Sequence, residues 1–147
     1  MKKTKRIITL SIFTLLLLSL LFLVGCGIAA PRFIQSPPND PNELVRLLER
    51  AGFRDVSISD GSEWSETTYV LVWGNRFRLG RNSSQQDIVN VYYFENEDDA
   101  IYLYNTQRYG FENPPMPIPD GWDYYWGIWR NGTIVSWWTY TRADLSS

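Results

Sequence analysis

Residues 122–141 read Trp122-Asp-Tyr-Tyr-Trp-Gly-Ile-Trp-Arg130, then Asn131-Gly132, then Thr133-Ile-Val-Ser-Trp-Trp-Thr-Tyr-Thr141. An Asn-Gly pair between two such runs is the strongest short-range signal of a β-hairpin. A two-residue turn at Asn131-Gly132 pairs Arg130 with Thr133 and places Trp126 opposite Trp137. The stretch therefore predicts two antiparallel strands.

Both faces of this predicted hairpin are aromatic, and one buried core does not account for two such faces. On one face, four rings surround a shallow gap between Gly127 and Ser136: Tyr125, Trp129, Trp138 and Tyr140. Because Trp and Tyr are enriched at interfaces, we expect these four side chains to form a surface for a ligand or partner. The alternative is that Trp64 or the Pro114–Pro119 segment covers them, since aromatic stripes are more often core.

The preceding residues predict two helices and further strands. Asp40-Pro41 caps a helix that Gly52 ends, and Asn96 caps a second helix that Gly110 ends. Strands are expected at 53–59 and 88–94, and a hairpin is expected at 67–79 with its turn at Gly74-Asn75. Residues 113–120 contain four prolines and predict an extended crossover.

The order helix, strand, hairpin, strand, helix, hairpin predicts a small single α+β domain. Its antiparallel sheet should have about five to six strands, with two helices packed on one face. The helix ending in Ala51-Gly52-Phe53 and the strand followed by Asn96-Glu-Asp-Asp-Ala100 look loosely like ferredoxin-like or related α+β domains. That likeness concerns the fold and carries no function.

The N-terminal residues have the pattern of an export signal. Lys2, Lys3, Lys5 and Arg6 precede an almost uninterrupted apolar run from Ile7 to Val24. A basic head followed by an apolar run and a small-residue exit is typical of such signals. The run ends in Leu23-Val24-Gly25-Cys26, which resembles the lipobox of bacterial lipoproteins.

The resemblance implies that the Cys26 thiol carries a diacylglyceryl group and that residues 1–25 are removed. Cys26 is the only cysteine in the chain, so it has no internal disulfide partner. Two or three acyl chains anchor a protein firmly, whereas one gives only marginal binding. The alternative is an uncleaved transmembrane anchor, because the run approaches the roughly 18–20 residues that span a bilayer. We expect residues 26–39, rich in proline and polar residues, to be a tether, and residues 40–147 to form the domain.

Composition excludes several chemistries for the mature chain. Removal of residues 1–25 leaves 16 acidic residues against ten arginines, a net charge of −6, with no lysine and no histidine. Histidine-dependent nucleophilic sites, Cys/His zinc sites, Schiff bases and a P-loop lysine are thereby excluded. We expect no cofactor, no metal and no nucleic-acid partner. Carboxylate chemistry remains, for example glycoside hydrolysis by an acidic pair.

These features favour an extracytoplasmic lipoprotein, held through Cys26 in the cell membrane, or in the outer membrane of a host that has one. The domain is expected to be a non-catalytic binding or structural module for an envelope protein or glycan. One alternative is a small carbohydrate- or peptidoglycan-active enzyme that uses Asp120 and Asp123 beside Trp122. A second is an inhibitor or immunity-type protein, suggested by the small acidic domain.

Overall fold

The computed structural model describes residues 28–61 and 67–145. The predicted signal, Cys26 and Trp64 lie outside these ranges. Eight elements follow in the order α2 (Arg32–Gln35), α3 (Pro41–Arg50), β1 (Asp55–Gly61), β2 (Tyr69–Leu79), β3 (Ser83–Phe94), α4 (Glu97–Glu112), β4 (Trp122–Asn131) and β5 (Ile134–Asp144).

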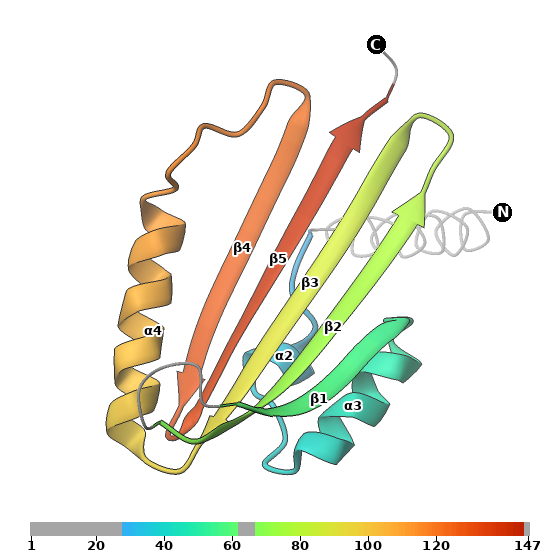
Figure 1. The fold of residues 1–147 in the computed structure, drawn as a ribbon. Coiled ribbons are helices and arrows are strands. Elements are labelled where there is room, and N and C mark those ends of the chain that lie inside the picture. Colours follow the sequence, from blue (N-terminus) through green and yellow to red (C-terminus); the bar gives the residue numbers. More distant parts are fainter. Residues whose placement is uncertain (1–27, 62–66, 146–147) are drawn as a thin grey trace, which may run out of the picture.

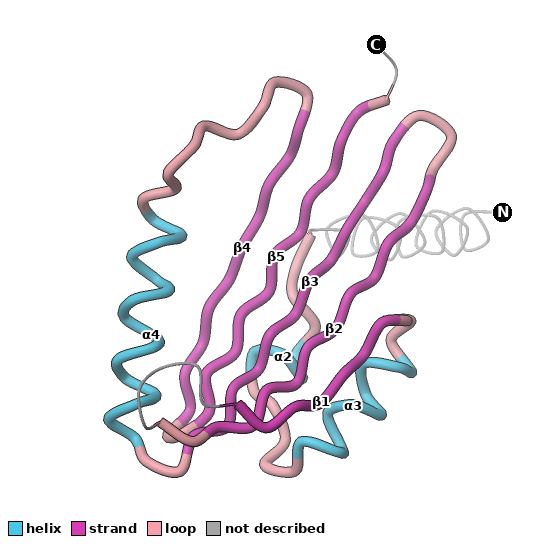
Figure 2. The backbone as a smooth tube through the Cα atoms, viewed as in Figure 1, coloured by secondary structure: helices cyan, strands magenta, loops and turns pink. Residues whose placement is uncertain are grey.

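The five strands form one antiparallel sheet in the order β1-β2-β3-β5-β4 (Figure 1). Strands β1, β2 and β3 follow one another as a meander. The chain then crosses through α4 to the far edge of the sheet and returns as β5 between β3 and β4 (Figure 2). This arrangement confirms the predicted α+β class and antiparallel sheet.

The C-terminal hairpin is confirmed, but its register differs from the prediction. Asn131 pairs with Ile134, so the turn is Gly132-Thr133 and Trp126 lies opposite Thr139. Gly132 has φ +57°, and the primed hairpin turns place a residue of positive φ at their first central position. Because each partner shifts by two residues, every side chain stays on its predicted face.

The predicted turn at Gly74-Asn75 is wrong, since β2 runs without interruption from Tyr69 to Leu79. A Cβ at Gly74 would lie 3.3 Å from Phe53 Cδ1 and 3.4 Å from Leu48 Cδ1. The glycine therefore gives α3 a close approach to the middle of a strand. The turn instead lies between Gly80 and Ser83, where the Gly80 amide donates to the Ser83 carbonyl at 2.8 Å.

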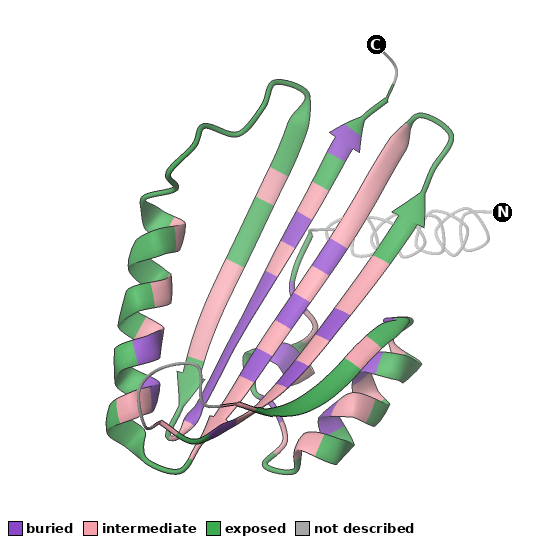
Figure 3. Ribbon diagram, viewed as in Figure 1, coloured by how far each residue is buried: buried purple, intermediate pink, exposed green. Residues whose placement is uncertain are grey.

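The prediction of two helices on one face is also wrong, because the helices cover opposite faces. Leu44 and Leu48 of α3 pack in one cluster with Val72, Val89 and Val91. Ala100 and Leu103 of α4 pack in a second cluster, with Val135 and Trp137. Strand β5 contributes to both clusters, so it is buried along most of its length (Figure 3). Each aromatic face of the hairpin therefore packs into a hydrophobic cluster of its own, one on each side of the sheet.

The helix starts agree with the capping residues predicted from the sequence. Asp40 accepts a hydrogen bond from the Asn42 amide, and Asn96 accepts one from the Asp99 amide. Gly52 follows α3 with φ +86°, a conformation that glycine adopts without strain. The second helix runs three residues further than predicted, through Gly110 to Glu112.

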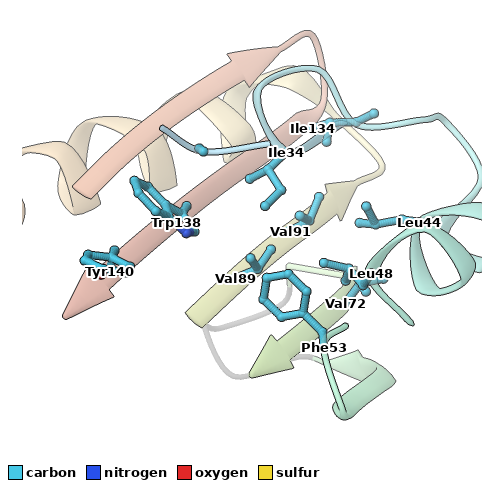
Figure 4. Close-up of a cluster of buried hydrophobic side chains, with 11 residues drawn as sticks. Ile34, Leu44, Leu48, Phe53, Val72, Val89, Val91, Ile134, Trp138 and Tyr140 are labelled. Atoms are coloured by element: carbon cyan, nitrogen blue, oxygen red, sulfur yellow. The ribbon is translucent and has the colours of Figure 1, made fainter. Parts of the chain in front are cut away.

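The N-terminal segment differs most from its prediction as a tether. Residues 32–35 form a helical turn, α2, and Ala30 and Ile34 are buried in the same cluster as α3. Figure 4 shows Ile34 pointing toward the side chains of Trp138 and Val91. Apolar residues at positions 30, 33 and 34 explain this docking, because a free tether gains nothing from them. The folded unit therefore begins by Ala30, not at residue 40.

Candidate functional site

The four rings predicted as a binding surface do not form one. Trp138 and Tyr140 are only 4% and 8% exposed, whereas Tyr125 is 44% exposed and Trp129 is half-buried. The expected gap at Gly127 is filled, because the Trp129 ring lies where a Cβ on Gly127 would stand. Only Tyr125 is well exposed, and its ring contacts Tyr140 at 6.0 Å between centroids.

The α2 segment is what covers this face. Ser136 Oγ donates a hydrogen bond of 2.6 Å to the carbonyl of Ile34, and Tyr93 Oη donates one of 3.0 Å to the carbonyl of Pro38. The Pro114–Pro119 segment, one of the two expected covers, lies on the other face of the sheet beside Trp122 and Tyr124. The other, Trp64, lies outside the described residues.

A buried ion pair lies on the side of the sheet that α2 and α3 cover, which we name the α2 face. Asp87, 4% exposed, accepts hydrogen bonds from Trp138 Nε1 and from Arg76 Nε, each at 2.9 Å. Arg76 also donates to the carbonyl of Ala51 at 2.8 Å, and its guanidinium lies 4.7 Å from the centre of the Phe53 ring. Arg76 Nη2 also lies 2.9 Å from Asp87 Oδ2, so every side-chain nitrogen and oxygen of the pair has a partner inside the protein. We therefore assign the pair a structural role.

A concave site lies on the opposite face, at the C-terminal half of α4. A hollow of about 440 Å³ separates this helix and the 113–121 segment from the edge of β4, and most of its lining is apolar. Phe111 stacks on Trp126 at its border, with 5.2 Å between ring centres. We name this hollow the groove; its side walls include Phe111, Met116, Ile118, Trp122 and Tyr124.

The groove was not predicted, although the sequence contains a signal of it. Met116 and Ile118 alternate with prolines in the 114–119 segment, and both are exposed. A solvated crossover has no need of large apolar side chains at that spacing.

Burial raises the pKa of Tyr124, the groove residue on the edge strand, above the ordinary tyrosine value.

Next to the groove, the sheet itself is accessible. Helix α4 packs on Tyr92, Phe94, Val135 and Trp137, at one end of the strands. Beyond them, side chains of β2, β3 and β5 on the same face reach solvent: most are half-buried, while Phe77 and Leu79 near the end of β2 are exposed. We name this surface the open face and define it by Trp73, Asn75, Gln86, Ile88, Asn90 and Thr139.

The acids considered for catalysis are not in a desolvated setting. Asp120 and Asp123 are both exposed, and Asp123 is on the α2 face of β4, away from Trp122. A glycosidase normally holds its catalytic acid in a desolvated cleft, whereas both aspartates are open to solvent.

Among residues 28–61 and 67–145, no three acidic, cysteine or histidine side chains are grouped so that they could hold a metal ion. In the same ranges, no helix combines the length and the apolar character needed to cross a membrane. Both the apolar run and Cys26 are outside these ranges.

The sequence matches no protein-family model, and comparisons with curated proteins and with solved structures also find no match. The function must therefore be argued from the residues and their arrangement.

Proposed function

We propose that this chain is an extracytoplasmic lipoprotein, anchored through Cys26, whose domain is a non-catalytic binding module. The observation that carries the proposal is the position of Cys26. The only cysteine of the chain stands directly after Leu23-Val24-Gly25, at the end of an apolar run with a basic head. A lone thiol in an exported protein is a reactive liability unless it is modified.

The docked N-terminal segment supports a binding role close to the membrane. Ala30 is buried and follows Cys26 by four positions, which span at most about 14 Å. An acylated Cys26 would hold the α2 face of the domain against the bilayer. The open face and the groove lie on the other side of the sheet, where a ligand could reach them without competing with the membrane.

The chemistry of this far side favours binding over catalysis. The groove is lined mostly by apolar and aromatic side chains, whereas the open face combines three amides and the Thr139 hydroxyl with Trp73 and Ile88. Such a mixture provides contact area and orienting hydrogen bonds, but it includes no carboxylate, histidine, cysteine or lysine side chain.

The anchor can be tested by growing cells that express the chain with an alkyne analogue of palmitate. We expect the label on the wild-type protein and none on Cys26→Ala, with Ser83→Ala as a control that keeps the label. A wild-type chain that takes up no label, or a Cys26→Ala chain that keeps it, would refute the lipid anchor.

A further inference from the structure

We propose that the open face binds an uncharged glycan chain, which lies across the strands from Trp73 toward Trp126. This inference rests on the proposed function in one respect only: it names a ligand for the side of the sheet that carries the open face and the groove. The binding itself does not require the anchor.

The open face is nearly free of charge, although the domain as a whole is acidic. On this face, β2, β3 and β5 carry no charged residue within their described ranges. The nearest charged positions on it are Asp55 at the edge of β1 and Arg130 near the β4–β5 turn, where it pairs with Glu97 at 2.7 Å. A surface without charge complements a ligand without charge.

The absence of cations disfavours anionic polymers. Nucleic acids and polyanionic polysaccharides are bound chiefly through lysine and arginine. The two arginines of β2, Arg76 and Arg78, have the parity of Val72 and so lie on the α2 face of the sheet. An anionic chain on the open face would find no counter-charge among the residues that define it.

The amides of the open face disfavour an acyl chain. Asn75, Gln86 and Asn90 lie on neighbouring strands, and Gln86 Nε2 donates to Asn75 Oδ1 at 3.1 Å. An apolar ligand would bury these groups without replacing the hydrogen bonds that water gives them, at a cost for each. Sugar hydroxyls both donate and accept, so they match amides and the Thr139 hydroxyl.

Aromatic rings lie on either side of the polar side chains of the open face. Trp73 on β2 pairs with Asn90, while Trp126 on β4 pairs with Thr139, which in turn pairs with Ile88. Strands β2 and β4 are three spacings apart, or about 14 Å. Indole rings offer flat apolar surfaces on which the C–H faces of sugar rings stack. Because the two tryptophans are also offset by two residues along the strands, their spacing suits an extended chain of several sugars better than a single sugar.

The groove supplies a raised wall at the β4 end. Trp122, two positions from Tyr124 on the same edge strand, is 47% exposed and lines it together with Met116 and Ile118. Thr141, which lines the groove, pairs with Gln86 of the open face, so the two surfaces adjoin.

The test is a titration of the full-length chain in detergent, followed by tryptophan fluorescence, with chitohexaose, cellohexaose and maltohexaose as probes. We expect at least one of these neutral hexasaccharides to change the emission saturably at micromolar to millimolar concentration. Trp73→Ala should weaken that binding about tenfold or more. Asn90→Ala, which removes only an amide, should weaken it by a smaller factor.

Tyr102→Ala is the matched control, because Tyr102 is an exposed aromatic residue on α4, outside both surfaces. It should leave the affinity unchanged, and unchanged near-ultraviolet circular dichroism should show that each variant is folded. The proposal is overturned if none of the three probes binds, or if Trp73→Ala and Asn90→Ala bind as well as the wild type. It is equally overturned if saturable binding appears only with polygalacturonate, an anionic polymer, or with octanoate, a soluble acyl chain. Palmitate labelling does not depend on this face, so a failure here is distinguishable from a failure of the anchor.

Discussion

Asp87 and Arg76 carry opposite charges into the α2 face of the sheet, and their partners explain why the core accepts them. The carboxylate has both Arg76 and the Trp138 indole as donors, and the guanidinium has a backbone carbonyl and an aromatic ring besides. Such a pair adds little net stability over apolar residues, but its members depend strongly on each other.

Asp87→Ala should therefore lower the free energy of unfolding by about 3 kcal/mol, because it leaves the largely buried Arg76 without its counter-ion. Urea denaturation followed by tryptophan fluorescence measures this change. Asp123→Ala, an exposed acid on the same face, is the control and should change stability by less than about 0.5 kcal/mol. Equal effects of the two substitutions would show that the buried network has no special role.

Tyr93 should make the stability of the domain fall at alkaline pH. Its pKa is raised by burial and, secondarily, by the nearby acids Asp40 and Glu43. The unfolded chain loses the phenolic proton at about pH 10, while the folded chain keeps it. Above that pH the unfolded state binds fewer protons, so stability falls as pH rises.

Unfolding midpoints in urea should therefore fall above about pH 10, and Tyr93→Phe should make this fall less steep. Tyr124 and Tyr140, whose pKa values are also raised mainly by burial, should account for part of what remains. Tyr102→Phe, at an exposed position, should leave the slope as it is. A Tyr93→Phe slope identical to that of the wild type would contradict this assignment.

At the scale of elements, the decisive feature is the α2 segment, because it converts a predicted tether into part of the core. Ile34 is fully buried, and Ser136 and Tyr93 fix the segment at two carbonyls. This docking explains why the aromatic face around Trp138 needs no external partner.

Ile34→Ala should lower the free energy of unfolding by about 2–4 kcal/mol, as expected for a large side chain removed from a packed core. Arg32→Ala, two residues away and exposed, should have little effect. Thermal or urea denaturation distinguishes the two outcomes. If Ile34→Ala were as stable as the wild type, the segment would be a tether after all.

Local signals predicted the elements better than their packing. Asp40 and Asn96 identify the helix starts and Asn131-Gly132 identifies the hairpin, because capping and turn chemistry act within a few residues. Gly74-Asn75 has the same local form as a turn, yet Gly74 lies within a strand. The close contacts that call for a glycine come from Leu48 on α3 and from Phe53 just after it. A sequence window around Gly74 does not contain that information.

The candidate sites show the same division. The aromatic richness of the hairpin was evident, but which face was buried depended on where α2, α3 and α4 dock. Trp138 and Tyr140 were predicted to lie at the surface, but they are buried in one cluster with Ala30 and Ile34. The prolines of the segment that contains Ala30 and Ile34 had indicated a linker, so its docking was not predicted. The groove depends on contacts between α4, the 113–121 segment and β4, which are distant in sequence.

At the scale of the whole molecule, the sheet separates two sides with different properties. One side carries the N-terminal segment with Ala30 and Ile34, α3 and the buried ion pair. Figure 4 shows Ile34 and Leu44 together on this side. The other side carries α4, the groove and the open face. We propose that the first side faces the membrane and that the second faces the ligand.

The intact mass of the chain purified from membranes tests this account most directly, with Cys26→Ala measured beside it. We predict a polypeptide that begins at residue 26 and is heavier than its sequence by a diacylglyceryl group, with or without a further acyl chain. The Cys26→Ala protein should lack this mass. A full-length, unmodified wild-type chain would contradict the account, because the apolar run would then be a retained anchor and Cys26 a free thiol.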